Sequence, residues 1–347
     1  MEGYNKKVIM SYWTICRMKT TKKIYVKVSI IFLLGGILLF SSCEKEENQK
    51  IEANRKTLFM YLPWSSNLTN YFYNNISDLE KCITKIGLNN EKVIVFISTG
   101  STEAMMFEIV SSHGRCKREI LKKYKSPPFT TIDGITAILN DVKAFAPASV
   151  YTMIIGCHGM GWLPVYEMKV RSAPHMKMHW EYQGVPLTRY FGGLTAEYQT
   201  DIKSLASGIA NAGMKMEYIL FDDCYMSSIE VAYELKDVTK YLIGSTSEMM
   251  AYGMPYAAIG EYLLGNPDYQ SGCEEFYNFY STYEIMPCGT LAVTDCSELE
   301  NMAAIIKSIN SKYSFDKSLR GTIQRLDGYT PVIFYDFADY ITSLCND

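Results

Sequence analysis

The chain has 347 residues, of which 48% are hydrophobic and 20% are charged, and its formal net charge is -3. This composition is typical of a globular protein, and the length is enough for one large domain or two smaller ones. The slightly acidic balance, with no basic stripe along the sequence, excludes the electrostatic pattern of a nucleic-acid-binding protein.

The first 43 residues have the pattern of a bacterial secretion signal. Three lysines at 22–27 precede an apolar run at 28–40, which has the length of a signal-peptide core and is too short to span a bilayer comfortably. Small residues and then Cys43 follow, as in a bacterial lipobox. We therefore expect translation from Met18, removal of the leader and lipidation of Cys43.

The lipid would anchor the protein to the bacterial cell envelope, at the outer membrane, on its periplasmic or its surface face. Residues 44–55 begin with a charged stretch and are predicted to be a flexible tether. Two alternatives stay open for the leader, namely an uncleaved anchor and a plain secretory signal.

Strands alternate with helices from residue 56 to about residue 264. The expected strands are 56–62, 92–98, 150–157, 216–222 and 241–245, and the expected helices are 68–86, 132–145, 201–212 and 225–236. A hairpin is expected from 103–110 to 117–124. This alternation predicts an α/β fold, with a mostly parallel sheet and helices on both faces.

The pattern changes after residue 265, where helices at 273–284 and 297–309 surround one strand at 289–294. We therefore predict one α/β domain at 56–264 and a smaller α+β subdomain at 265–347. A long irregular insert at 159–196 interrupts the first of these, and loops of that length are usually functional or mobile.

Two apolar runs end abruptly in a reactive residue, His158 in one case and Cys224 in the other. Sites in α/β sheets form beyond the carboxyl ends of the strands, so we expect the imidazole and the thiol at one rim. A cysteine nucleophile needs such a base, because only the thiolate attacks. Gly159 permits a sharp turn, and its amide and that of Cys224 are candidate oxyanion donors. The helix expected from Tyr225 would favour the thiolate through its N-terminus.

Each of these features alone has a structural explanation. A buried cysteine before a helix is usually structural, and a His-Gly pair is usually a turn. Their occurrence at the ends of two buried strands in one domain is what points to a site. The remaining cysteines show no Cys-x-x-Cys pair and no zinc-ligand spacing with histidine. We expect Cys82, Cys157 and Cys296 to be buried free thiols.

The two blocks resemble those of the clostripain family of cysteine peptidases, in the wider clan of caspases, legumain and gingipains. The family's blocks read roughly Asp-His-Gly-Gly-Gly-Trp and Phe-Asp-Ala-Cys-Leu-Met. Here the blocks are Cys157-His158-Gly159-Met160-Gly161-Trp162 and Phe221-Asp222-Asp223-Cys224-Tyr225-Met226. Further agreement lies at Tyr61, Asn67-Leu68, 229–235 and Ser247-Glu248, so the resemblance covers roughly residues 56–260.

The resemblance implies a caspase-like fold and a cysteine endopeptidase that cuts after Arg, or after Lys. Cys224 would be the nucleophile and His158 the general base and acid. Asp222 matches the acid of the substrate pocket, where a carboxylate can grip a guanidinium through two hydrogen bonds, and Glu248 is expected to contact substrate as well.

The resemblance also implies activation by self-cleavage, for which Lys169, Arg171 and Lys177 in the insert are candidate sites. Some relatives are calcium-dependent, so calcium is a possible cofactor, although no EF-hand-like Asp-x-Asp-x-Asp-Gly loop is present. The expected partners are peptides or proteins containing Arg or Lys, and the protein is expected to be a monomer.

Two positions depart from the family's blocks. Asp223 replaces a small residue before the nucleophile, where it would disfavour the thiolate, point away, or add to the acidity of the pocket. Cys157 replaces the acid before the histidine, and no motif names another residue that orients the imidazole. Two other functions therefore stay open, an inactive surface-anchored homologue that binds peptides and a cysteine hydrolase acting on another amide or ester.

Overall fold

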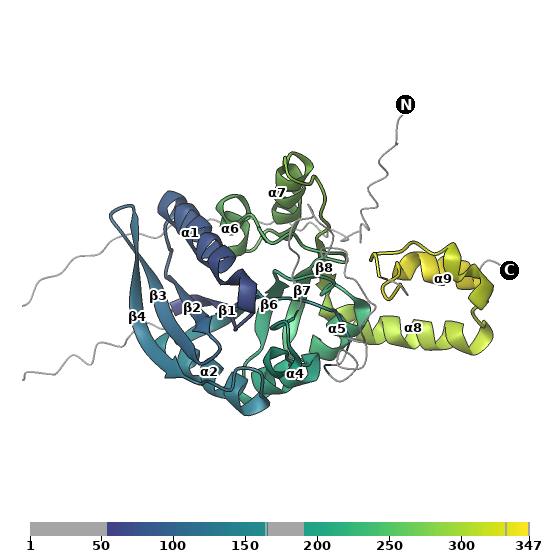
Figure 1. Cartoon of the computed structure of the whole chain (residues 1–347), viewed down its shortest axis with the longest axis horizontal. Helices are drawn as coiled ribbons and strands as arrows, with labels where there is room; N and C mark the ends of the chain where they lie inside the picture. Colours follow the sequence, from purple (N-terminus) through teal and green to yellow (C-terminus); the bar gives the residue numbers. More distant parts are fainter. Residues whose placement is uncertain (1–53, 164, 166–190, 330–331, 346–347) are drawn as a thin grey trace, which may run out of the picture. The chain divides into compact units, whose positions relative to one another are not determined.

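The computed structural model describes residues 54–163, 165, 191–329 and 332–345 of the chain. In these residues eight strands form one sheet, in the order β4-β3-β2-β1-β5-β6-β7-β8 (Figure 1). Neighbouring strands pair in parallel along β2-β1-β5-β6-β7. At one end of the sheet β3 and β4 are added by antiparallel pairing, and at the other end β8 is. The strand bounds are β1 Asn54–Leu62, β2 Glu91–Gly100, β3 Glu103–Ser112, β4 Arg115–Lys125, β5 Ala148–Ile155, β6 Met216–Phe221, β7 Thr239–Gly244 and β8 Ala292–Asp295.

The central strands are buried on both faces, which explains their nearly continuous apolar sequences. In β1, Leu58, Met60 and Leu62 belong to the core on one side of the sheet. Phe59 and Tyr61 belong to the core on the other side. This alternation follows from the two-residue period of a strand.

Helices cover both faces of the sheet (Figure 1). One layer contains α1 Thr69–Ile86, α6 Tyr256–Leu263 and α7 Tyr269–Ser281, and the other contains α2 Ile132–Phe145, α4 Ile202–Asn211 and α5 Ile229–Leu235. Two helices, α8 Leu299–Lys312 and α9 Phe337–Cys345, follow β8. The predicted fold class, a mostly parallel sheet with helices on both faces, is confirmed.

The later part of the chain contributes to the same sheet, because β8 pairs antiparallel with β7. The described residues belong to one compact unit. The division between 56–264 and 265–347 stays a prediction.

Several predictions fall on residues outside the described ranges. These are the signal peptide at 1–43 with Cys43, most of the tether at 44–55, and the cleavage candidates Lys169, Arg171 and Lys177. Within the described ranges, no helix combines the length and the apolar character needed to cross a membrane.

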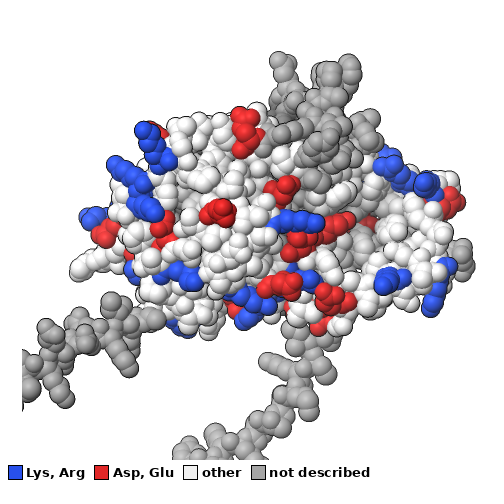
Figure 2. Space-filling model, turned by 90° about the horizontal axis from the view of Figure 1, so that it is seen from below, with Lys and Arg blue, Asp and Glu red and all other residues white. Residues whose placement is uncertain are grey.

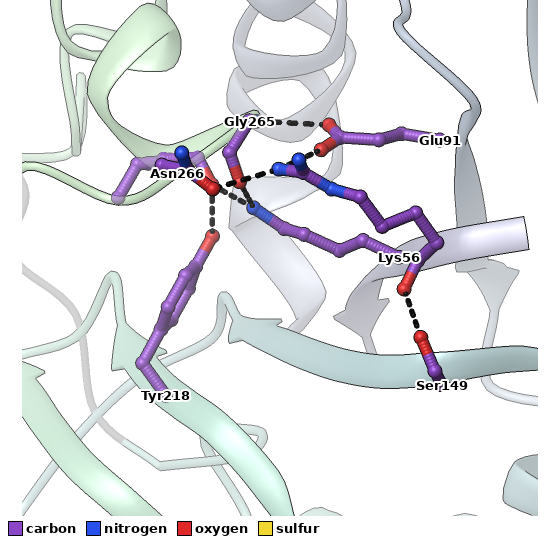
Figure 3. Close-up of polar contacts among 8 residues, drawn as sticks. Lys56, Glu91, Ser149, Tyr218, Gly265 and Asn266 are labelled. Carbon is purple, nitrogen blue, oxygen red and sulfur yellow. Dashed lines mark hydrogen bonds and ion pairs between the residues drawn. The ribbon is translucent and has the colours of Figure 1, made fainter. Parts of the chain in front are cut away.

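A buried lysine ties the loop after α6 to the amino ends of β1 and β2 (Figure 3). Lys56 Nζ donates to the carbonyl oxygens of Leu263 at 2.6 Å and Gly265 at 3.1 Å. Glu91 accepts the Gly265 N–H at 2.9 Å. Burial lowers the pKa of Lys56 from 10.5 to about 8. Because this cluster is at the amino ends of the strands, it supports the sheet from the side opposite to the carboxyl ends.

The surface in Figure 2 carries acidic and basic side chains intermixed. Ion pairs of the described surface include Lys240 with Glu217 at 2.6 Å and Lys122 with Asp141 at 2.6 Å. On the face shown, the charges do not form the one-sided basic field that nucleic acids require.

Candidate active site

Strands β5 and β6 bring the two predicted blocks to one rim of the sheet. The strands are parallel neighbours, and their pairing ends at Ile155 and Phe221. The Asp222 N–H extends it by donating to the Ile155 carbonyl at 2.8 Å. His158 and Cys224 each lie three residues beyond the last pair, so equal lengths of chain carry the imidazole and the thiol past the strand ends.

Gly159 packs directly on the backbone of the cysteine block. A Cβ atom at this position would lie 2.3 Å from the Cys224 carbonyl oxygen, 2.9 Å from the Cys224 nitrogen and 2.8 Å from the Asp223 Cβ. No side chain fits into that space, which explains the glycine. The loop that follows β5 therefore lies against the loop that follows β6.

Asn67 orients the imidazole of His158, which is 2% exposed. His158 Nε2 lies 2.8 Å from Asn67 Oδ1. Because an amide oxygen only accepts, Nε2 carries the proton, and in the neutral ring the lone pair is on Nδ1. The His158 N–H donates to the Gly192 carbonyl at 3.1 Å, which fixes the backbone of the same residue.

Asn67 is one of the positions that agree with the family's pattern, and the sequence alone indicates no role for it. It lies in a short 3-10 helix, Ser66–Leu68, that follows β1, and β1 is the parallel neighbour of β5. Its position in the sequence, directly after a predicted strand, is the signal that could have identified Asn67 as a site residue. A polar residue after the carboxyl end of a strand adjacent to β5 reaches the same rim as His158.

The sulfur of Cys224 is buried and lies against the backbone of Met249. The Met249 N–H donates to Cys224 Sγ at 3.2 Å, and the Met249 carbonyl oxygen lies 3.6 Å from the same sulfur. The adjacent Tyr225 N–H donates to the Ser247 carbonyl at 2.9 Å. An N–H group directed at sulfur stabilises negative charge there.

The helix expected to begin at Tyr225 begins later, so this prediction is wrong at its start. Tyr225 has φ +59°, in the left-handed region, and turns the chain away from helical geometry. Helix α5 begins at Ile229 with Ser228 as its N-cap. A helix terminus acts over about one turn, so α5 begins too far along the chain to act on the sulfur, whereas the Met249 N–H donates to it directly.

Asp222 is buried with two neutral donors. Its Oδ1 accepts the Met254 N–H at 2.8 Å, and its Oδ2 accepts the Tyr256 hydroxyl at 3.0 Å. Glu248 lies close to Tyr225, since the pKa of Tyr225 is raised chiefly by burial and also by Tyr329 and Glu248.

The two departures from the family's blocks contact each other. Asp223 is fully buried, and its Oδ1 accepts the Cys157 N–H at 2.6 Å. The Cys157 thiol lies 3.6 Å from Asp223 Oδ2. Both carboxylate oxygens are thus directed at Cys157. The prediction that Cys82, Cys157 and Cys296 are buried free thiols is confirmed.

A segment near the C-terminus packs on both loops, which the sequence did not predict. The rings of Phe334 and Tyr225 are stacked, with centroids 4.4 Å apart and planes 4° apart. The Tyr329 hydroxyl donates to Met160 Sδ at 3.2 Å. A Cβ at Gly161 would lie 2.7 Å from the Phe334 ring. Aromatic side chains far along the chain therefore brace the loops that carry His158 and Cys224.

The described residues contain no group of three or more His, Cys, Asp or Glu side chains that could hold a metal ion. The histidine, the thiol and the acid of the rim are instead held by amide, backbone and hydroxyl groups. A thiol, an imidazole and an inward-facing carboxylate at one sheet rim are the parts of a cysteine protease of the caspase-like class.

Comparisons with known proteins agree. The model of the clostripain family, Peptidase_C11, matches residues 60–344. A solved structure of a secreted C11 cysteine protease from Bacteroides thetaiotaomicron, "iotapain", is 60% identical over 85% of this chain and 81% of that chain, with a TM-score of 0.78. An inactive zymogen C11 protease from Parabacteroides distasonis is 25% identical over 84% and 78%, with a TM-score of 0.69.

A further secreted C11 cysteine protease from Bacteroides thetaiotaomicron, solved with an irreversible peptide inhibitor, shares the fold at 20% identity and a TM-score of 0.67, over 84% of this chain and 79% of that chain. No curated protein matches the chain. The chain belongs to the clostripain family, and it is a cysteine protease.

Proposed function

We propose that the protein is an endopeptidase that cleaves peptide bonds after Arg, and secondarily after Lys, with Cys224 as the nucleophile and His158 as the general base and acid. The observation that carries this proposal is the packing of Gly159 on the Cys224 backbone. It holds the imidazole loop and the thiol loop together beyond two paired strands, as nucleophilic catalysis by a thiol requires.

In the proposed reaction, His158 Nδ1 takes the proton of the Cys224 thiol, and the sulfur attacks the carbonyl carbon of the scissile bond. The amides of Gly159 and Cys224 donate to the oxyanion. The imidazolium then protonates the leaving amine as the C–N bond breaks and a thioester remains. Water, deprotonated by the same imidazole, hydrolyses the thioester and restores the thiol.

Asn67 supports this sequence of steps through its contact with Nε2. An imidazole whose Nε2 is held by an acceptor presents Nδ1 for proton transfer. The same bond stabilises the ring when it is charged, because both ring nitrogens are then donors. In the family an acidic residue precedes the histidine, and in this chain Cys157 takes that position. Asn67 is therefore proposed to orient the imidazole of His158 instead.

Asp222 is the proposed specificity residue. Asp222 is buried beyond the end of β6, next to the block that carries the nucleophile, and a guanidinium can bind a carboxylate through two N–H groups. Glu248, beside Tyr225, is the proposed second acidic contact. Two acids favour Arg or Lys over neutral residues before the scissile bond.

The site of action and the activation remain proposals as well. We propose lipidation at Cys43, placement outside the cytoplasm, monomeric function and self-cleavage at Lys169, Arg171 or Lys177. One relative is described as secreted and another as an inactive zymogen, which supports the second and the last of these. Calcium is proposed as an activator.

The test compares wild type and Cys224→Ala, both beginning at residue 44. Each is incubated, with and without calcium, with peptides that differ only in carrying Arg, Lys or Gln at one position. Intact-mass spectrometry then reports peptide cleavage and any break in the protein chain. Cleavage after Arg by wild type alone is expected. Cleavage by both proteins, or equal cleavage after Gln, would contradict the proposal.

The burial of the site favours one alternative, an inactive homologue that binds peptides. Cys224 is 1% exposed and His158 is 2% exposed, so a substrate must displace covering atoms to reach the thiol. If this alternative holds, wild type and Cys224→Ala will bind an Arg peptide with equal affinity in a titration, and neither will cleave it.

A further inference from the structure

We propose that Asp223 is a positioning residue whose carboxylate locks the end of β5 to the loop that carries the nucleophile, and so sets the imidazole of His158 relative to the thiol. The proposal rests on the roles proposed above for His158 and Cys224. Asp223 directly precedes the cysteine, and its partner Cys157 directly precedes the histidine.

The bond takes over where the strand pairing stops. Backbone pairing of β5 with β6 ends at Ile155 and Phe221. The Gly156 N–H donates to the other neighbouring strand, at the Tyr61 carbonyl, at 3.1 Å. The next N–H, of Cys157, donates to Asp223 Oδ1 at 2.6 Å. A side chain thus continues the link between the two strands one step beyond the backbone ladder.

The link is short and screened from water. Both Asp223 and Cys157 are 0% exposed, and a hydrogen bond inside a protein is electrostatically stronger than one in water. Each partner is joined by a single peptide bond to a proposed catalytic residue, Asp223 to Cys224 and Cys157 to His158. A shift of this bond therefore moves the thiol and the imidazole relative to each other.

Asp223 is inferred to act through its neighbours, since its Oδ1 accepts the Cys157 N–H and its Oδ2 lies 3.6 Å from the Cys157 sulfur. Loss of the carboxylate leaves the Cys157 N–H to find another acceptor, and the loop must move to reach one. A displacement of about 1 Å at a catalytic group costs on the order of 100-fold in rate. Substrate binding in the pocket of Asp222 is not affected by the same change.

The two positions also allow an exchange. Because Cys157 Sγ lies 3.6 Å from Asp223 Oδ2, a carboxylate presented from position 157 would reach the same space from the opposite loop. The double variant Cys157→Asp/Asp223→Ala therefore restores a buried carboxylate between the loops. Cys157→Ala is the matched control, because it removes the thiol and keeps the N–H that Asp223 binds.

The experiment measures kcat and KM on an Arg peptide for wild type, Asp223→Ala, Asp223→Asn, Cys157→Ala and the exchange variant, after circular dichroism has shown that each is folded. Asp223→Ala is expected to lower kcat about 100-fold with little change in KM. Cys157→Ala is expected to resemble wild type, and the exchange variant to recover about 10-fold or more over Asp223→Ala.

A second measurement keeps the result independent of peptide cleavage. The rate of Cys224 alkylation by iodoacetamide at neutral pH is followed by peptide mass, with the buried Cys82 as the internal reference. Asp223→Ala and His158→Ala are expected to slow it to a similar degree, because both uncouple the imidazole from the thiol. If wild type cleaves no peptide, the proposed function fails and this measurement alone decides the role of Asp223.

Wild-type kcat or a wild-type alkylation rate in folded Asp223→Ala would overturn the proposal. An exchange variant that is folded but no faster than Asp223→Ala would overturn it as well. If Asp223→Ala does not fold, Asp223→Asn decides, because its Oδ1 still accepts the Cys157 N–H. That variant is expected to keep more than about a tenth of the wild-type kcat, and a loss comparable to that of His158→Ala would contradict the account.

Discussion

The contact between Asn67 and His158 gives a prediction whose size follows from the structure. Asn67→Ala removes the 2.8 Å bond to Nε2. A net hydrogen bond is worth about 0.5–1.5 kcal/mol. Asn67 is exposed, so water can reach the vacated position and the full cost of an unpaired buried donor does not apply. The expected loss in kcat is therefore about 2- to 10-fold, much smaller than for His158→Ala.

The assay is steady-state cleavage of an Arg peptide across pH, with thermal unfolding measured in parallel. Asn70→Ala is the matched control, because Asn70 is also exposed and lies three residues further on, in the first turn of α1. Asn67→Asp adds a test of sign. A carboxylate at Nε2 favours the imidazolium, so the basic imidazole is formed only at higher pH and the acid limb of the rate profile moves upward.

Equal kcat values for Asn67→Ala and Asn70→Ala at every pH would show that Asn67 does not orient the imidazole. A change in KM alone for Asn67→Ala would show the same, since that pattern indicates lost substrate binding and not a misplaced base.

Four further predictions follow from other parts of the structure. Gly159→Ala should abolish cleavage, at a cost above about 100-fold, because its Cβ would lie 2.3 Å from the Cys224 oxygen; near-normal kcat would contradict the packing described here. Asp222→Asn should lower kcat/KM for Arg peptides by more than about 10-fold and leave hydrolysis of small neutral thioesters unchanged; an equal loss on both substrates would count against a pocket role. Phe334→Ala should lower kcat severalfold and Tm measurably, because it removes the ring stacked on Tyr225; Tyr335→Ala, at the next position, is the control. Burial lowers the pKa of Lys56 to about 8, so the unfolded chain binds more protons than the folded chain from about pH 8 to about pH 10. Over that range the unfolding free energy of wild type should rise relative to that of Lys56→Met by about 1.4 kcal/mol per pH unit. A difference between the two proteins that stays constant with pH would contradict this prediction.

The sheet could be predicted because its strands are apolar runs of the right length between helices with a clear apolar face. The expected 132–145 helix is α2 without change, and the expected first strand lies within β1. Local sequence determines such elements, because a strand that is buried on both faces needs an apolar side chain at nearly every position.

The start of α5 could not be predicted, because tertiary contacts decide it. The sequence from Tyr225 onward suits a helix, but Tyr225 has a left-handed backbone and donates to the Ser247 carbonyl. The residues that complete the site are missed for a related reason. Asn67 lies 91 positions from His158, and Tyr329 lies 169 positions from Met160, and no periodicity connects residues so far apart.

The two departures from the family's blocks could be found in the sequence but not interpreted there. Considered separately, Asp223 suggests a disfavoured thiolate at Cys224, and Cys157 suggests that the imidazole of His158 lacks its usual orienting acid. Only the adjacency of β5 and β6 shows that they contact each other.

Cleavage after Arg by the proposed mechanism requires that Cys224 forms a covalent bond with the substrate. The most direct test is rapid acid quenching of wild type mixed with an Arg peptide ester, followed by digestion and mass spectrometry. An acyl mass ending in Arg is expected on the fragment that contains Cys224. This mass should disappear as product forms and should be missing from Cys224→Ala. Product formation without this adduct, or with the adduct on another residue, would contradict the account.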